Sequence, residues 1–215
     1  MMTKSLTRPK CLKAGDLVGV VAPSSPPFES GQLAFSLGWL QKLGLRAKIS
    51  DQVLSRQGDF AGSDRERLEA LHSMWADPEV AAVIAVRGGN GCARLLSHVD
   101  YSLFEKQPKI LIGFSDISAL LVAVHQQTGL VTFHGPTFGA FFQSAYTFSW
   151  FSRVLFDCSA IGDISDPADL SDLGPPYPPA RLVIAPGSAR GQLTGGNLTT
   201  LKELMGTPFE IDTRG

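Results

Sequence analysis

Short apolar runs, rich in β-branched residues, alternate along the chain with longer amphipathic stretches. The apolar runs predict five buried strands, at 17–22, 45–49, 80–86, 110–114 and 130–133. Helices are expected at about 30–43, after the capping box Ser63-Asp-Arg-Glu66, from 93 and after 115. Because each crossover between parallel strands needs a helix, the alternation predicts an α/β domain with a parallel sheet covered on both faces. We expect a flavodoxin-like or Rossmann-like arrangement.

The pattern changes after Phe138. Residues 141–155 are rich in aromatic side chains and are expected to form a helix, whereas 166–186 contain six prolines. Fixed φ angles and missing N–H donors exclude a regular helix or a central strand there. Beyond the prolines, a strand or turn and a short helix over 198–205 are expected. The predicted organisation is an α/β domain, a proline-rich linker and the start of an incomplete C-terminal domain, at 1–160, 161–189 and 190–215.

Composition excludes several classes of partner. Lys and Arg total 19 against 20 Asp and Glu, without a basic run between aromatics, so nucleic acid is not an expected partner. No apolar run is long enough to span a membrane, and the N-terminus lacks a signal sequence. Cys11, Cys92 and Cys158 are odd in number and widely spaced, which predicts neither a disulfide framework nor a zinc site. A reducing cytoplasm and no metal or cofactor are therefore expected.

Polar and glycine-rich loops follow four of the predicted strands. They are Pro23-Ser24-Ser25, Arg87-Gly-Gly-Asn-Gly91, Ser115-Asp116 and His134-Gly135. Sites in parallel α/β sheets form outside the carboxyl ends of the strands. We therefore expect these loops to meet at one crevice.

Ser115, between a predicted strand and a helix, has two interpretations. A serine followed by aspartate at a helix start is typical of an N-cap, and the local pattern favours this simpler reading. Alternatively, a tight turn presents the hydroxyl as a nucleophile, and the next N–H helps to form an oxyanion hole. Gly113 fits the first glycine of that motif, but Ile117 replaces the second.

The loop 87–91 also has two interpretations. Its glycines permit close approach of the backbone to a ligand, so that its N–H groups could bind an anion or an oxyanion, but a simple strand-to-helix turn explains them equally well. The loop matches neither the Walker phosphate-binding loop nor the dinucleotide fingerprint, which makes nucleotide binding a minor alternative. Cys92 is interpreted as a packing residue rather than a reactive thiol.

A serine nucleophile needs a base, normally histidine. Of the four histidines, only His134 follows a predicted strand beside the expected crevice. It is the candidate base within this chain, although a structural histidine bonded to backbone is the more common situation.

Five segments, taken in order, resemble the LD-carboxypeptidase family of serine peptidases, which includes microcin C self-immunity peptidases. The matching segments are 15–24, 86–91, 112–117, 133–136 and 191–198. Each is weak alone, but their order and spacing match across nearly the whole chain. The resemblance favours the nucleophile interpretation of Ser115 over the N-cap.

The resemblance implies a Ser-Glu-His triad with Ser115 as nucleophile and an oxyanion hole from the N–H groups of Asp116 and Gly89. Substrate contacts would come from Ser24, Arg87, Gly88 and Asn90. The implied substrate is a small murein peptide with a terminal D-alanine, cleaved in the cytoplasm during peptidoglycan recycling. Members of the family often form homodimers.

Two departures from the family qualify this expectation. Position 90 is often aromatic in the family but is Asn90 here. The triad Glu and His lie in the family's C-terminal domain, the Glu soon after the position of Gly215, so both are expected to be absent from this chain. Little hydrolysis is then predicted for these 215 residues alone. The alternatives are a microcin C self-immunity-type peptidase and a non-catalytic peptide-binding or interaction domain.

Overall fold

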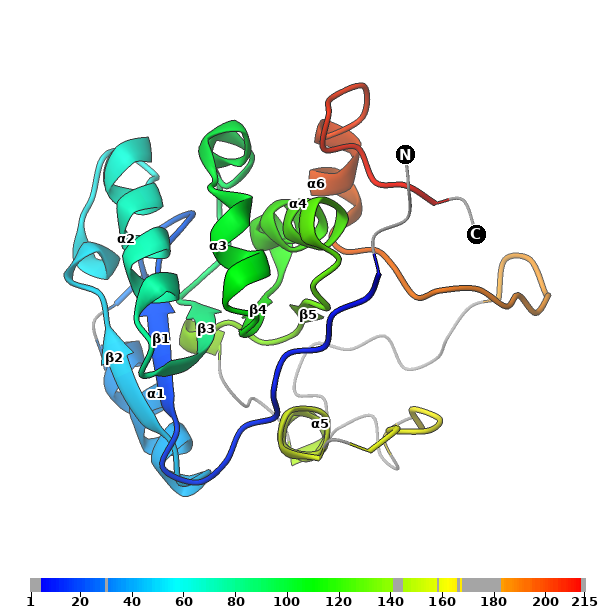
Figure 1. The fold of residues 1–215 in the computed structure, drawn as a ribbon, viewed down its shortest axis with the longest axis horizontal. Helices are drawn as coiled ribbons and strands as arrows, with labels where there is room; N and C mark the ends of the chain where they lie inside the picture. The colour runs from blue at the N-terminus through cyan, green and yellow to red at the C-terminus, as the bar shows by residue number, and fades with distance from the viewer. Residues whose placement is uncertain are drawn as a thin grey trace.

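A computed structural model describes residues 5–29, 31–140, 145–157, 159–165, 167 and 183–213. Its centre is a five-stranded parallel sheet in the order β2-β1-β3-β4-β5 (Figure 1). The strands are β1 (Leu17–Val21), β2 (Arg46–Ile49), β3 (Val80–Ala85), β4 (Ile110–Gly113) and β5 (Phe133–His134). This is the flavodoxin-like order, and it confirms the predicted fold class.

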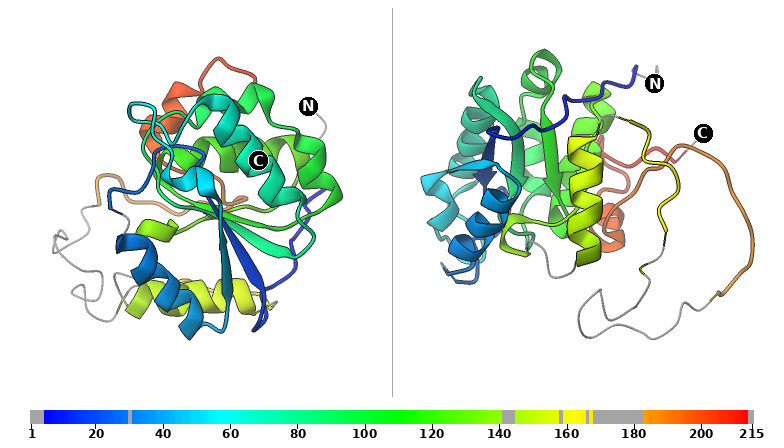
Figure 2. Two further views of the ribbon diagram at one scale, coloured as in Figure 1. Left: turned by 90° about the vertical axis from the view of Figure 1, so that its left-hand side faces the viewer. Right: turned by 90° about the horizontal axis from the view of Figure 1, so that it is seen from below.

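Helices cover both faces of the sheet, as the left view of Figure 2 shows. One layer contains α2 (Asp64–Ala76), α3 (Tyr101–Lys106) and α4 (Ser118–Thr128), and the other contains α1 (Gly31–Lys42) and α5 (Ala145–Phe156). Two separate apolar clusters correspond to these layers, one centred on Trp75 and Phe104 and the other on Leu40 and Phe151. The core is therefore divided by the sheet.

The strand β1 shows why the apolar runs are continuous. All five of its residues are buried. Leu17 and Val21 belong to the cluster under α2 and α4, whereas Val18 and Val20 belong to the cluster under α1 and α5. A strand that is covered on both faces has no polar side to alternate with.

The helix α2 begins where the capping box predicts. The Glu66 N–H donates to Ser63 Oγ at 3.2 Å, and the Ser63 N–H donates to Glu66 Oε2 at 2.7 Å. Two of the unpaired N–H groups at the helix start are thereby satisfied.

Some predicted elements differ in the structure. The helix expected from residue 93 is a 3₁₀-helix, Ala93–His98, and α3 was not predicted. The strand expected at 130–133 is only Phe133–His134, because the Val131 N–H donates to Thr7 O of the N-terminal segment at 2.9 Å. Pairing with a segment so distant in sequence leaves no local signal.

The C-terminal described segment packs against α4. No strand occurs over 190–197, and α6 (Leu198–Glu203) begins after Asn197, whose side chain caps it. The Asn197 N–H donates to Ser118 Oγ at 3.0 Å, and Leu204 joins the core cluster that contains α4. The domain boundaries predicted at 160 and 189 stay predictions, and much of the predicted linker lies outside the described residues.

One expectation about the cysteines is wrong. Cys11 is disulfide-bonded, whereas Cys92 is free and buried. Odd number and wide spacing therefore did not exclude a disulfide, and the argument from cysteines for a reducing compartment no longer holds. None of the described helices combines the length and apolar character needed to cross a membrane.

Candidate active site

Ser115 lies in a strained turn between β4 and α4. Among the described residues it is the only non-glycine residue with a positive φ, 61°. Such a conformation costs about 1–3 kcal/mol for a residue with a Cβ, and it is found mainly where surrounding structure enforces it. Ser115 opens a short 3₁₀-helix, Ser115–Ile117, that leads directly into α4.

The Ser115 hydroxyl does not cap this helix. Neither the 3₁₀-helix nor α4 has a side-chain capping bond, and Ser115 Oγ makes no hydrogen bond with any residue that the structure describes. The side chain is partly exposed. The N-cap interpretation is therefore wrong, and the geometry is that of a hydroxyl presented by a tight turn.

The glycine loop after β3 lies directly against Ser115. A Cβ at Gly88 would stand 2.8 Å from Ser115 Cβ, and one at Gly89, whose φ is 127°, would stand 2.0 Å from Ser25 Oγ. Only glycine permits this approach of the loop to both neighbours. Within the described ranges, the N–H groups of Gly88 and Gly89 donate no hydrogen bond. Two unpaired backbone donors thus lie beside the Ser115 turn.

Asp116 directs its carboxylate away from solvent and into the loops. Its Oδ2 accepts from Ser24 Oγ at 2.5 Å and from the Cys92 N–H at 2.9 Å. Burial of the carboxylate raises the pKa of Asp116. The side chain therefore connects the loops after β1, β3 and β4.

Ser24 occupies a different position from the expected substrate contact. Its side chain is fully buried, and Ser24 Oγ lies 3.0 Å from the carbonyl oxygen of Asn90 as well as near Asp116. With both contacts inside the loops, this hydroxyl is a structural link between them.

The other two polar residues of the loop region differ in accessibility. The Arg87 guanidinium donates to Pro26 O at 3.1 Å and lies 3.4 Å from the ring centroid of Phe28. Asn90 donates its N–H to Ser25 Oγ at 3.3 Å, and the residue is exposed. Asn90 is therefore the more accessible candidate for a ligand contact.

His134 lies next to the turn but does not reach Ser115. It is paired in register with Gly113, and its ring meets the Phe114 ring edge-on with centroids 6.5 Å apart. No hydrogen bond joins His134 to Ser115 in the described part of the chain. Loss of water around the imidazole lowers the pKa of His134, which favours the neutral form that a general base needs. Its role as a base stays a prediction.

The remaining histidines are engaged elsewhere. His72 Nε2 accepts from the Asp100 N–H at 3.1 Å, His98 contacts Ser97 Oγ at 3.0 Å and His125 contacts Leu130 O at 2.9 Å. Burial raises the pKa of the Cys92 thiol well above its ordinary value, as expected of a packing residue. Among the described residues, no group of three acidic, His or Cys side chains could hold a metal ion.

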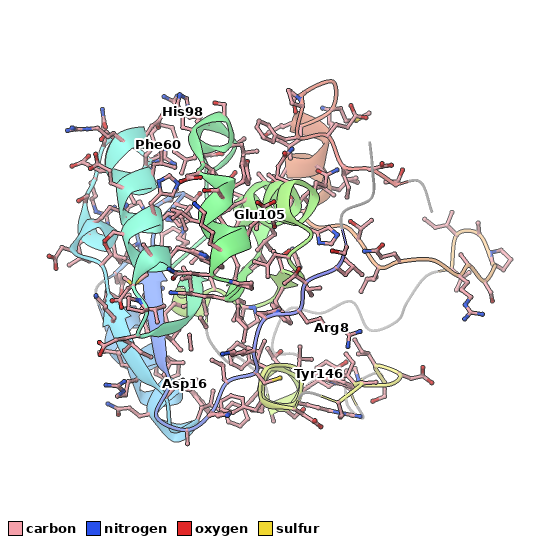
Figure 3. All side chains as sticks on the ribbon, viewed as in Figure 1. Arg8, Asp16, Phe60, His98, Glu105 and Tyr146 are labelled. Carbon is pink, nitrogen blue, oxygen red and sulfur yellow. The ribbon has the colours of Figure 1, made fainter. Side chains whose placement is uncertain are left out.

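A groove of about 1070 Å³ runs beside the edge strand β5, between α4 and α5. His134 and Gly135 line it, but Ser115 does not. Figure 3 labels Arg8 and Tyr146, which line the groove from the N-terminal segment and from α5. The groove and the Ser115 turn are therefore separate features, and the groove is lined by Ile112 of β4 and by the end of β5.

Sequence comparison decides the family. Residues 18–135 match the family described as LD-carboxypeptidase N-terminal domain, and this span includes all of β1 except its first residue, the glycine loop and Ser115. The chain belongs to the LD-carboxypeptidase family. A probable murein peptide carboxypeptidase of Bacillus subtilis (strain 168) is 42% identical over 217 residues, covering 97% of this chain and 62% of that protein.

Solved structures of LD-carboxypeptidase relatives share the fold. An MccF-like protein from Bacillus anthracis str. Ames superposes with a TM-score of 0.80 at 26% identity, covering 97% of this chain and 67% of that one. Muramoyltetrapeptide carboxypeptidase from Oxalobacter formigenes superposes with a TM-score of 0.70 at 26% identity, covering 93% of this chain and 63% of that one. The chain thus spans less than two thirds of the length of the Bacillus subtilis relative.

Sequence reasoning missed Arg67, which is fully buried behind the loops. Its guanidinium donates to Pro23 O and Gly91 O, at 2.6 and 2.9 Å. One signal was available: Arg67, Leu71 and Trp75 share one face of α2 at a spacing of four, so a charge lies on the apolar side.

Proposed function

We propose that this chain supplies the nucleophile and oxyanion hole of a serine LD-carboxypeptidase that releases terminal D-alanine from murein peptides. The observation that carries the proposal is the strained Ser115 turn, which lies against Gly88. Among the described residues, the Ser115 hydroxyl makes no hydrogen bond and the N–H groups of Gly88 and the adjacent Gly89 donate none. The name of the Bacillus subtilis relative supports the substrate class.

In the proposed reaction, Ser115 Oγ attacks the carbonyl carbon between an L-configured residue and the terminal D-alanine. The carbonyl oxygen gains negative charge, which the N–H groups of Asp116 and Gly89 stabilise. Each donor of this kind is worth about 10²–10³ in kcat. Cleavage of the C–N bond releases D-alanine and leaves an acyl-enzyme, which water hydrolyses. Asn90, Arg87 and Gly88 would contact the peptide.

The Ser115 proton requires a base. We propose that the triad Glu and His belong to a second domain whose first residues are 190–215, with His134 as the alternative base within this chain. Turnover by these 215 residues that is lost on His134→Ala would favour the alternative. Binding of a murein peptide without turnover would favour the second-domain base or a purely peptide-binding role.

The decisive experiment measures D-alanine release from a murein tetrapeptide. It uses a longer form of the protein whose sequence continues beyond Gly215. Ser115→Ala is expected to abolish release, because no other hydroxyl lies in the turn. Ser97→Ala, a change at an exposed serine that contacts only His98, should leave release unchanged. Full activity of Ser115→Ala would remove Ser115 from the mechanism.

A second candidate function is hydrolysis of an aminoacyl-adenylate-type peptide, as in microcin C self-immunity. The TM-score of 0.80 with the MccF-like protein supports it. Comparing kcat/KM for the two substrates in one preparation distinguishes the candidates. A cytoplasmic location and a homodimeric state complete the proposal.

A further inference from the structure

Two buried charged side chains, Arg67 and Asp116, each hydrogen-bond to the loops after β1 and β3. Arg67 comes from the first turn of α2, and its exposed fraction is 0%. Its Nη1 contacts Pro23 O in the loop after β1 and Gly91 O in the loop after β3, and its Nη2 pairs with Asp64. A buried guanidinium is costly unless hydrogen-bonded, so these carbonyls are essential partners.

Asp116 accepts hydrogen bonds from the residues that directly follow the two carbonyls bound by Arg67. Its Oδ2 accepts from Ser24 Oγ and from the Cys92 N–H. Arg67 therefore holds the carbonyls of Pro23 and Gly91, and Asp116 holds the donors that follow them in sequence. The arrangement connects the two loops twice.

The segment between these contacts contains the unpaired glycine donors. Asn90 is held through its N–H by Ser25 and lies with its carbonyl oxygen 3.0 Å from Ser24 Oγ. Gly88 is in close contact with Ser115 at the other end of the segment. The position of the Gly88 and Gly89 N–H groups relative to Ser115 thus depends on the loop after β1.

We propose that Arg67 and the Asp116 side chain act as positioning residues that fix the oxyanion-hole loop against Ser115. We call these two residues the Arg67–Asp116 clamp. The inference rests on the proposed function for its catalytic consequence. Its structural consequence, an ordered loop 88–92, can be tested without any substrate.

The chain offers matched controls for each half of the clamp. The Ser24 hydroxyl and the Cys92 N–H both donate to the same oxygen of Asp116. In Asp116→Asn the amide oxygen can take the place of that oxygen and keep both bonds, whereas Asp116→Ala loses both. Arg94 shares two partners with Arg67, because it pairs with Asp64 and lies 5.3 Å from the Phe60 ring, against 5.1 Å for Arg67. Figure 3 labels Phe60.

Arg94 is the control for Arg67 because its side chain is 60% exposed and contacts neither loop carbonyl. Arg67→Met leaves Pro23 O and Gly91 O without this donor, and Asp64 keeps Arg94 as a partner. Arg94→Met leaves the loop contacts intact.

The first measurement is amide hydrogen exchange at Cys92 and Asn90 in the 215-residue chain. Asp116→Ala should accelerate exchange at Cys92 by about tenfold, the equivalent of one lost hydrogen bond. Asp116→Asn and Arg94→Met should stay within about twofold of the unsubstituted chain. Ser24→Ala, which removes the hydroxyl that contacts Asp116 and Asn90 O but removes no charge, provides the same comparison in a milder variant. Unchanged exchange in both Asp116→Ala and Ser24→Ala would overturn the clamp.

The second measurement determines kcat and KM separately for D-alanine release by the longer form of the protein, which continues beyond Gly215. A misplacement of about 1 Å can cost roughly 10²-fold, so kcat should fall by about that factor in Arg67→Met and Asp116→Ala. KM should change much less, because the lost interaction is made in the transition state. Arg94→Met should retain most of kcat, because its side chain contacts neither loop carbonyl.

The outcomes distinguish the clamp from the proposed function. If kcat is unchanged while exchange at Cys92 accelerates, the clamp has no part in catalysis and the inference fails. If Ser115→Ala remains fully active, the proposed nucleophile fails instead, and the exchange result still decides whether the loop is held as described.

Discussion

The backbone at Ser115 is held in a conformation that an L-residue adopts only at a cost. A hydroxyl that served only to cap a helix would need no such strain, because N-caps have extended backbone. The free hydroxyl and the strain occur together at this residue. Local conformation thus identifies the candidate nucleophile more specifically than the amino-acid pattern around it.

The strain at Ser115 predicts a difference in stability between two variants, Ser115→Gly and Ser115→Ala. Ser115→Gly should unfold with a free energy about 0.5–1 kcal/mol higher than Ser115→Ala, because glycine adopts a φ of 61° without a Cβ clash. The gain is partly offset by the greater freedom of glycine in the unfolded chain. Urea unfolding of both variants measures the difference. Equal stability, or a more stable Ser115→Ala, would show that the turn is unstrained.

At the level of elements, α2 has two functions in the fold. Its apolar face covers the sheet through Leu71 and Trp75, and its first turn positions Arg67 behind the loops. The capping box at Ser63 fixes where that first turn begins. A local sequence signal therefore determines the position of a side chain that contacts residues far away in the chain.

Loss of the cap should weaken α2 measurably. Ser63→Ala is expected to lower the free energy of unfolding by about 1 kcal/mol, because the Glu66 N–H loses its acceptor. Ser50→Ala is the matched control, since Ser50 precedes the 3₁₀-helix Asp51–Leu54 without making a capping bond. Thermal or urea unfolding of the two variants gives the comparison. An equal loss in both would mean that the capping box contributes nothing specific.

At the level of the whole molecule, the sheet brings together loops that are distant in sequence. The sequence predicted the strands and most helices because burial on both faces produces continuous apolar runs. It also predicted that Ser24, Gly89 and Ser115 would be close, since parallel strands end at one edge. The buried position of Ser24 and the role of Arg67 were not predictable, because their partners lie in other loops.

The assembled loops also create a linkage between stability and pH. Burial raises the pKa of Asp116 in the folded chain only, so between the ordinary value of 3.8 and the raised value the folded state binds more protons than the unfolded state. The contribution of Asp116 to stability therefore falls as pH rises through this window. Below it, both states are protonated and the contribution is constant.

The measurement is the free energy of unfolding against pH for the unsubstituted chain and for Asp116→Asn. The difference between the two curves isolates Asp116 from the carboxylates whose pKa values are lowered, such as Asp64 and Asp77. Relative to Asp116→Asn, the unsubstituted chain should lose stability as pH rises above 3.8. Parallel curves would contradict a raised pKa.

The contact between Asn197 and Ser118 joins the C-terminal segment to the helix that follows the Ser115 turn. Ser118 is the first residue of α4 and lies three positions after Ser115, and a methyl group at Gly196 would come within 2.7 Å of Ser118 Oγ. The Ser118 hydroxyl is therefore the point at which residues 196–197 contact the start of α4, so the C-terminal segment is packed three residues away from Ser115.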